Sequence, residues 1–375
     1  MSLLLYSAIL TAAIPVSIYL IYIVAVIFTK ENSGNKVENP PDITIVIPTY
    51  NEEKVIEHRI KNLRDINYPA DKIHAIVVDD RSSDNTVEFA KGAFDKYNVS
   101  GEVIVKDSRT GTNESVNLGV KSAKTDFVVT TDADVVFEDD AIDYAIGTLL
   151  NDDNIGAVCG ELEPIVKEKS FTTGSEKAYR SVYGKMCTWE SHVHSTYCFN
   201  GPLIALKKKA FSPIPATHGA SDAGMALEII RNGYRCIYEV NAKFYEYITE
   251  NLTQQRRQKI RRSSRLQEAT LHNINLISSK YGKFGTLIFP MRFLMFFVVP
   301  VTFFVSVILW SLFLAQFNIL FGLVIVAGFA GALISGLWSS NILSSFIWHQ
   351  VYLLFSLRYM FKGKHIWQAI DREKV

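Results

Sequence analysis

The sequence predicts an α/β fold in which a mostly parallel sheet, with helices on both faces, is held between membrane-spanning helices. Between about residues 40 and 250, short apolar runs of strand type alternate with helical segments. Strands that are apolar throughout are typical of parallel sheets covered on both faces. In addition, residues 3–28 and 293–357 contain no Asp, Glu, Lys or Arg, and about 20 apolar residues suffice to cross a bilayer.

The first strand and helix follow a polar segment, residues 31–41, whose Gly and Pro indicate a linker. Residues 43–48 are apolar and rich in β-branched side chains, which predicts a buried strand ended by a proline. Glu52 and Glu53 are expected to open a helix that reaches about Leu63.

The same alternation continues along the chain. Further strands are predicted at 73–78, 103–105, 127–131, 155–159, 203–206, 236–240 and 243–247. Helices are predicted after an N-cap at Asp84, over 113–123 and 170–189, and over 222–231 with Gly233 as its C-cap. Ligands of parallel sheets bind at the carboxyl ends of the strands. The polar clusters at 48–53, 79–83 and 132–134 should therefore converge in one crevice.

The segment Asp132-Ala133-Asp134 follows the buried strand at 127–131 directly. Side chains two residues apart in extended backbone point to one side. Two carboxylates on one side suit a hard divalent cation, which prefers oxygen ligands and leaves room for phosphate oxygens. The alternative is a pair of solvated acids in a turn.

A strongly basic segment, residues 254–265, has helical spacing. It places Arg257, Arg261 and Arg265 in one row, with Gln258 beside Arg261. This row fits either a face exposed to solvent or lipid headgroups beside a membrane, or a cationic clamp for a pyrophosphate. The formal net charge of +1 over 375 residues argues against nucleic acid as a partner.

In this order and spacing, the motifs resemble those of the membrane-embedded members of glycosyltransferase family 2. This family of inverting nucleotide-sugar transferases has the GT-A fold and includes cellulose, chitin and hyaluronan synthases and polyprenyl-phosphate sugar transferases. The resemblance covers about residues 40 to 270. It is carried by Pro48 to Glu53 (P-x-x-N-E), Asp79 to Thr86, Arg109 to Gly119, Asp132-Ala133-Asp134 (D-x-D), Cys198 to Pro202, Gly219 to Arg235 and Gln258 to Arg262.

The resemblance implies a role for each matching residue. Asp222 would be the general base, and Asp132 and Asp134 would hold Mg²⁺ or Mn²⁺. The donor-binding residues would be Pro48, Tyr50, Glu52, Asp79, Asp80, Arg109, Asp132, Gln258 and Arg261. The acceptor side would be formed by Trp189, Asn200, Gly201 and Pro202.

Three positions depart from the family pattern. Ser221 stands where Glu or Asp is usual, and Thr112 where many members have Lys, a loss for which Arg109 could compensate. Arg262 replaces the Trp of the Q-x-x-R-W motif, which weighs against long-chain processivity but not against transfer.

The function implied is inverting, metal-dependent transfer of a sugar from a nucleotide-sugar, with a UDP-sugar favoured, to a membrane-associated glycan or lipid. Two alternatives stay open. One is a polyisoprenyl-phosphate glycosyltransferase that uses GDP-mannose or UDP-glucose. The other is a catalytically weak nucleotide-sugar-binding partner subunit.

The expected organisation is an integral protein of the cell membrane. Residues 1–29 would form a transmembrane anchor, 40–250 a cytosolic GT-A catalytic domain, 251–291 basic interfacial helices, 292–358 a transmembrane region in contact with membrane lipids, and 359–375 a cytosolic basic tail. Basic residues on both sides of the catalytic domain favour this orientation. Three apolar stretches, 293–314, 318–337 and 340–357, would leave the tail outside if each crossed. A re-entrant or interfacial stretch would reconcile the count with a cytosolic tail.

Overall fold

The computed structural model describes residues 2–29, 34–165, 171–216, 219–247, 252–335 and 342–360. Within these ranges, residues 34–165 and 190–247 form one compact unit, here called the sheet unit. Residues 2–29, 171–189 and 252–360 form another, here called the helical unit. The predicted basic tail lies outside the described residues from residue 361 onward.

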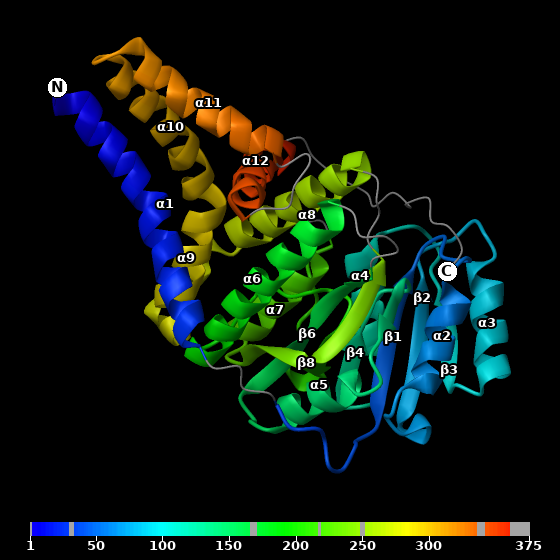
Figure 1. Ribbon diagram of the computed structural model, residues 1–375. Coiled ribbons are helices and arrows are strands. Elements are labelled where there is room, and N and C mark those ends of the chain that lie inside the picture. The colour runs from blue at the N-terminus through cyan, green and yellow to red at the C-terminus, as the bar shows by residue number, and fades with distance from the viewer. Residues whose placement is uncertain are drawn as a thin grey trace. The chain divides into compact units, whose positions relative to one another are not determined.

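The sheet unit alternates strands and helices (Figure 1). Its strands are β1 (Ile43–Thr49), β2 (Ile73–Asp79), β3 (Gly101–Val105), β4 (Phe127–Thr130), β5 (Val135–Phe137), β6 (Ile155–Ile165), β7 (Ile204–Lys207) and β8 (Arg235–Tyr247). Its helices are α2 (Ile56–Asp65), α3 (Thr86–Tyr97), α4 (Thr112–Ser122), α5 (Ala141–Leu150) and α7 (Ser221–Arg231), with short 3₁₀ turns at Ala70–Lys72 and Lys208–Ala210.

The eight strands form one mixed sheet in the order β3-β2-β1-β4-β7-β6-β8-β5. The first four pair in parallel, as predicted from their apolar sequences. In the other half β7 is antiparallel to both β4 and β6, and β5 is antiparallel to β8, whereas β6 and β8 pair in parallel. The sheet is therefore wholly parallel in the half that carries the three polar clusters and mixed in the other half.

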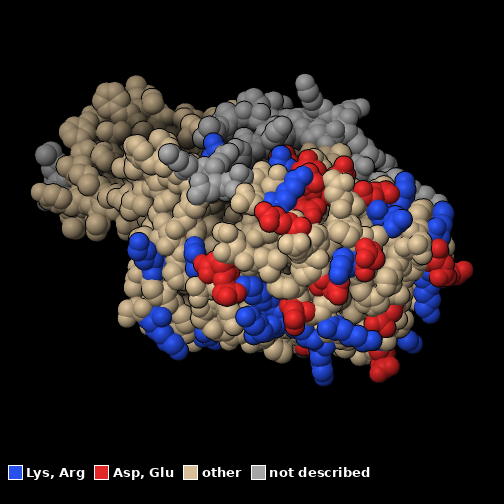
Figure 2. All heavy atoms as spheres, turned by 90° about the horizontal axis from the view of Figure 1, so that it is seen from below, with Lys and Arg blue, Asp and Glu red and all other residues tan. Residues whose placement is uncertain are grey.

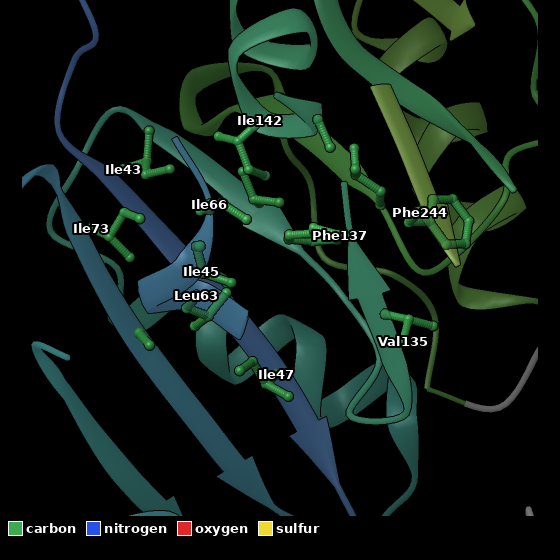
Figure 3. Close-up of a cluster of buried hydrophobic side chains, with 14 of the residues drawn as sticks. Ile43, Ile45, Ile47, Leu63, Ile66, Ile73, Val135, Phe137, Ile142 and Phe244 are labelled. Atoms are coloured by element: carbon green, nitrogen blue, oxygen red, sulfur yellow. The ribbon is translucent and has the colours of Figure 1, made fainter. Parts of the chain in front are cut away.

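Alternate side chains of β1 face opposite sides of the sheet, and both sides are covered. Ile43, Ile45 and Ile47 are fully buried in a core that includes Leu63 and side chains of α3 and α5, as Figure 3 shows for β1, Leu63 and β5. On the other face Gly119 of α4 approaches β1 so closely that an added Cβ would lie 2.2 Å from Val46 Cγ1. Helices on both faces were predicted and are confirmed.

Several expected boundaries were wrong. Helix α2 begins at Ile56 rather than at Glu52, because Asn51 has a left-handed backbone (φ 55°) and a turn joins the amides of residues 55 and 56 to the Glu52 carbonyl. The two short strands expected at 236–240 and 243–247 are one strand, β8, with an irregularity in its pairing to β6. Strand β5 and helix α5 were not predicted.

The predicted linker is held on the sheet unit in its described part. The Gly34 amide donates to Glu239 Oε2 at 2.9 Å, and the Val37 amide donates to the Asp143 carbonyl at 3.1 Å. An added Cβ on Gly34 would lie 2.0 Å from Thr148 Oγ1. Residues 34–37 are therefore part of the sheet unit rather than a free connection.

The helical unit contains the apolar segments. Its helices are α1 (Ser2–Phe28), α6 (Phe171–Val193, up to Trp189), α8 (Leu252–His272), α9 (Phe289–Phe293), α10 (Val299–Ala315), α11 (Ile319–Ser335) and α12 (Ile342–Met360), with π-helical turns at Phe284–Ile288 and Leu294–Val298. Helix α8 packs on α12 through buried Gln267, whose Nε2 donates to the carbonyls of Phe296 (2.9 Å) and Leu353 (3.1 Å). Ser356 Oγ donates to Gln267 Oε1 at 2.6 Å.

Among the described residues, two helical segments are long and apolar enough to cross a membrane, Leu3–Phe28 and Phe284–Ala315. Helix α11 is apolar but shorter, with 17 residues. Helix α1 contacts other parts of the helical unit, since Tyr22 meets Trp189 edge-on with ring centres 5.4 Å apart. On the face of the molecule in Figure 2, acidic and basic side chains are interspersed.

Candidate functional site

The loops that follow β1 and β2 are bonded to each other. The Asn51 amide donates to Ser82 Oγ, and the Ser83 amide donates to Asn51 Oδ1, both at 2.9 Å. The amide of buried Glu52 donates to Thr86 Oγ1 at 2.8 Å. Pro48 lies beside Val78 in the β1–β2 register. Two of the three polar clusters therefore meet at the carboxyl ends of the strands, as predicted.

Asp79 and Asp80, both buried, hold the loops that follow β2 and β3. Asp79 Oδ2 accepts the Ser82 amide at 2.9 Å. Asp80 accepts the amides of residues 110 and 111 at 2.8 Å each and pairs with Lys106 Nζ at 2.6 Å. A carboxylate has about four acceptor positions, so a nucleotide contact would be additional to these bonds.

Lys106 was missed by the sequence analysis. It follows β3 directly, where the rule that pointed to the ends of β1, β2 and β4 also applies. Its Nζ bonds Asp80 and Ser115 Oγ (3.1 Å), so it joins the β2 end to α4. Beside it, the Arg109 guanidinium lies 3.6 Å from the centre of the Tyr50 ring, which brings two predicted donor-binding residues into direct contact.

Asp132 and Asp134 follow β4 at the same edge of the sheet. The Thr131 amide donates to the Val46 carbonyl at 3.0 Å, which fixes the start of this segment beside β1. No group of three or more His, Cys, Asp or Glu that could hold a metal occurs within the described ranges. Two neighbouring carboxylates, such as Asp132 and Asp134, would suit Mg²⁺ or Mn²⁺ that takes its other oxygens from phosphates and water.

Arg59 and Asn62 of α2, which were not predicted as site residues, support the backbone that follows the D-x-D segment. Arg59 is fully buried, and its Nη1 donates to Asn62 Oδ1 at 2.6 Å and to the Val135 carbonyl at 3.3 Å. Burial lowers the pKa of Arg59 to about 9, and the negative charges of Asp132 and Asp134 oppose that shift. Arg59 lies at helical spacing from apolar Ile56 and Leu63, and this spacing is the one sequence signal that could have pointed to its burial.

Asp222 lies beside the predicted acceptor loop. An added Cβ on Gly201 would be 3.5 Å from Asp222 Oδ2, and Asp222 Oδ1 accepts the Ala223 amide at 2.8 Å. Asn200 is fixed by bonds from its Nδ2 to the Gly160 carbonyl (3.1 Å) and Tyr238 Oη (3.0 Å). Buried Pro202 completes the loop.

The strand register brings this loop to the edge that carries Asp132. In the antiparallel pair β4 and β7, Thr130 lies opposite Ile204. The chain therefore leaves β4 toward Asp132 at the end where it enters β7 from Gly201. Asp132, Asp134 and Asp222 are thus gathered at one edge of the sheet unit.

Three predicted site residues belong to the helical unit. Gln258 and Arg261 lie in α8, and Trp189 lies in α6 with its ring against Tyr22 of α1. The sheet unit by itself brings together the predicted metal, base and acceptor-loop residues and the other predicted donor-binding residues.

Comparison with known proteins identifies a family that matches part of the chain. Residues 44–207 match the family described as Glycosyl transferase family 2. The chain carries a glycosyltransferase family 2 domain. The matched range contains β1, except for its first residue, β2 to β7 and the D-x-D segment.

Two curated relatives share part of their length with the chain. A probable glycosyltransferase, YdaM, of Bacillus subtilis is 34% identical over 135 residues, which are 36% of this chain and 32% of that protein. The poly-beta-1,6-N-acetyl-D-glucosamine synthase of Staphylococcus aureus is 28% identical over 265 residues, which are 68% of this chain and 60% of the synthase.

A solved structure shares the fold across the glycosyltransferase family 2 domain and beyond it. The mannosyltransferase PcManGT from Pyrobaculum calidifontis, in complex with GDP-Man and Mn²⁺, superimposes with a TM-score of 0.79 at 23% identity. The match covers 96% of this chain and 99% of that one. The predicted GT-A fold is confirmed.

Proposed function

We propose that the chain transfers a sugar from a nucleotide-sugar to a membrane-associated glycan or lipid, with inversion at the anomeric carbon. The observation that carries the proposal is the meeting of Asp132, Asp134 and Asp222 at one edge of the sheet. Asp132 and Asp134 lie in the loop after β4, and Asp222 lies in the first turn of α7. This edge therefore gives a place for a diphosphate and, beside it, a base for an incoming hydroxyl.

In this mechanism Asp132 and Asp134 hold Mg²⁺ or Mn²⁺. The ion, when bound, neutralises the negative charge that grows on the departing diphosphate. Arg109, stacked on Tyr50, and Glu52 border the donor. Asp79 and Asp80 hold the loops after β2 and β3 through their bonds to backbone amides. The donor-binding roles of Gln258 and Arg261 rest on the sequence motif Gln258 to Arg262.

Asp222 takes the proton from the acceptor hydroxyl, whose oxygen attacks the anomeric carbon as the bond to the diphosphate breaks. General-base catalysis contributes about 10²–10⁴-fold, so Asp222→Asn should reduce transfer by at least about 100-fold and leave nucleotide affinity unchanged. Asp95→Asn, at an exposed carboxylate of α3, is the matched control and should be fully active. Loss of nucleotide binding by Asp222→Asn would contradict the role.

A substitution of Gly201 tests whether the acceptor binds beside Asp222. Gly201→Ala puts a methyl group 3.5 Å from Asp222 Oδ2, an ordinary contact distance, so the fold should tolerate it. The methyl group occupies space beside the base. Transfer should therefore fall, while hydrolysis of the donor by water, a smaller acceptor, should be less affected. An equal loss of both would place Gly201 outside the acceptor path.

The donor is identified by assaying the detergent-purified protein with Mn²⁺ and UDP-glucose, UDP-GlcNAc, UDP-galactose or GDP-mannose, with and without total lipid extract. A UDP-sugar is the first expectation. GDP-mannose is the second, because the mannosyltransferase that shares the fold was solved with GDP-Man. Stimulation by lipid favours a lipid acceptor over a glycan such as the product of the related synthase. Nucleotide binding without turnover of any donor would support a non-catalytic partner subunit instead.

We also propose that the protein is anchored in the cell membrane by α1 and the C-terminal helices, with the sheet unit in the cytosol. Lys91→Cys introduces an exposed thiol in α3, whereas the four native cysteines are buried. A membrane-impermeant maleimide should label this thiol only after the cells are permeabilised. Labelling in intact cells would overturn the orientation.

A further inference from the structure

Arg59 occupies an unusual place for an arginine. It lies inside the apolar face of α2, between Ile56 and Leu63, and its side chain is fully buried. The guanidinium carbon lies 3.8 Å from the centre of the Phe137 ring. Among the described residues, its Nε and Nη2 have no hydrogen-bond partner. Burying a cation with unsatisfied donors costs considerable stability, so packing alone would favour an apolar residue here.

The contacts that Arg59 does make lead to the short strand after the D-x-D segment. Its Nη1 donates to the Val135 carbonyl at 3.3 Å and to Asn62 Oδ1 at 2.6 Å. Buried Asn62 in turn accepts the Phe137 amide at 2.8 Å and donates to the Phe137 carbonyl at 3.1 Å. Three backbone groups of β5 are therefore bound by two side chains of α2.

Strand β5 needs such support because of its place in the sheet. It has three residues and lies at the edge of the sheet, where β8 is its one partner among the described strands. An edge strand leaves backbone groups without a partner strand, and buried backbone groups require hydrogen bonds. Arg59 and Asn62 supply them, so they take the place of a neighbouring strand.

The two acids lie one and three residues before Val135, with Ala133 buried between them. A segment of this length moves with β5, and Arg59 is also attracted by both carboxylates. The same guanidinium therefore holds the segment through a backbone bond and through charge.

We infer that Arg59, acting together with Asn62, is a positioning residue that holds Asp132 and Asp134 in the geometry for binding the divalent cation. The inference rests on the proposed function, because it assumes that these two acids bind the metal. Neither residue touches the ion in this arrangement. Both act through β5.

The test separates geometry from charge. Removing the positive charge of Arg59 would by itself strengthen the attraction of a cation to the acids and would confuse the result. Arg59→Lys keeps that charge but loses the planar group that reaches both Asn62 and the Val135 carbonyl. Asn62→Ala leaves Arg59 in place and removes both bonds to Phe137. Asn67→Ala is the matched control, since the exposed Asn67 side chain bonds Asp140 and not β5.

The measurement is the affinity of the full-length purified protein for Mn²⁺, in the presence of UDP and, separately, of GDP. The electron paramagnetic resonance signal of free Mn²⁺ reports how much of the ion is bound. Loss of groups that orient metal ligands costs about 10–100-fold in metal affinity, and Arg59→Lys and Asn62→Ala should each weaken Mn²⁺ binding by about 10-fold or more. The double variant should lose less than the product of the two, because both residues hold one strand. Asn67→Ala should bind as the natural protein does.

Asp134→Asn separates failure of the positioning role of Arg59 and Asn62 from failure of the metal site itself. If it abolishes Mn²⁺ binding while Arg59→Lys and Asn62→Ala bind as tightly as the natural protein, the positioning role is overturned and the metal site stands. If Asp134→Asn itself binds normally, the proposed metal site fails and the inference fails with it. If Arg59→Lys does not fold, Asn62→Ala decides the question alone.

Discussion

The pair formed by Lys106 and Asp80 offers the sharpest test of how the donor loops are held. The two side chains are 10% and 7% exposed, and Nζ lies 2.6 Å from Oδ1. Lys106→Met removes the cation and leaves a buried carboxylate. Removing one partner of a buried pair costs about 3–5 kcal/mol. Asp80 keeps two amide donors at 2.8 Å, so we expect the lower end, about 3 kcal/mol.

The free energy of opening is measured by hydrogen exchange of the β2 and β3 amides in the full-length protein, which reports on the sheet unit separately from the helical unit. The double variant Lys106→Met/Asp80→Asn leaves no buried charge. Its loss should be about 2 kcal/mol smaller than the sum of the single losses. Nucleotide affinity should fall in both single variants, because the loop at residues 109–111 loses its anchor. Lys91→Met, at an exposed lysine of α3, should change neither quantity.

Two results would refute this reasoning. Single losses below about 1 kcal/mol would mean that the pair behaves like an exposed one. Losses that add within about 0.5 kcal/mol would mean that the two side chains do not act on each other.

Two further predictions concern packing and pH. Gly119→Ala forces a Cβ to within 2.2 Å of Val46 Cγ1 and should destabilise the sheet unit by about 1–3 kcal/mol. Gly92→Ala, in α3, places its Cβ where no atom lies within 4 Å and should stabilise the sheet unit by about 0.4–1 kcal/mol. Hydrogen exchange of the β1 amides measures both changes. Burial and the charge of Arg235 lower the pKa of His194, so the unfolded chain takes the proton first and stability should fall as the pH drops below about 6.5. His194→Gln should lessen this fall in thermal-unfolding scans, and an unchanged pH dependence would contradict the assignment.

The sequence was sufficient wherever a structural feature depends on neighbouring residues. Apolar β-branched runs fixed β1 to β4, and a parallel sheet has only one edge to which the carboxyl ends of those strands can lead. The convergence of the loops at Asn51, Asp79 and Asp132 followed from that rule. Asp222 was assigned on a motif, and its position beside Gly201 came only from the structure.

The sequence was insufficient where long-range partners decide. Val135-Val136-Phe137 is too short to be recognised as a strand, and it forms one because β8 and α2 bind its two sides. The antiparallel pairings of β5 and β7, the attachment of residues 34–37 and the single strand β8 depend in the same way on segments far along the chain.

Charged residues show most clearly what could not be predicted from the sequence. Arg59 and Lys106 look in the sequence like surface cations, because a charge in a helical repeat or after a strand is usually solvated. Local sequence patterns determined β1 to β4 and the edge of the sheet that carries the acids. Only the tertiary structure decided which cations are buried with those acids, because the stability of a buried charge depends on the groups that the fold brings around it.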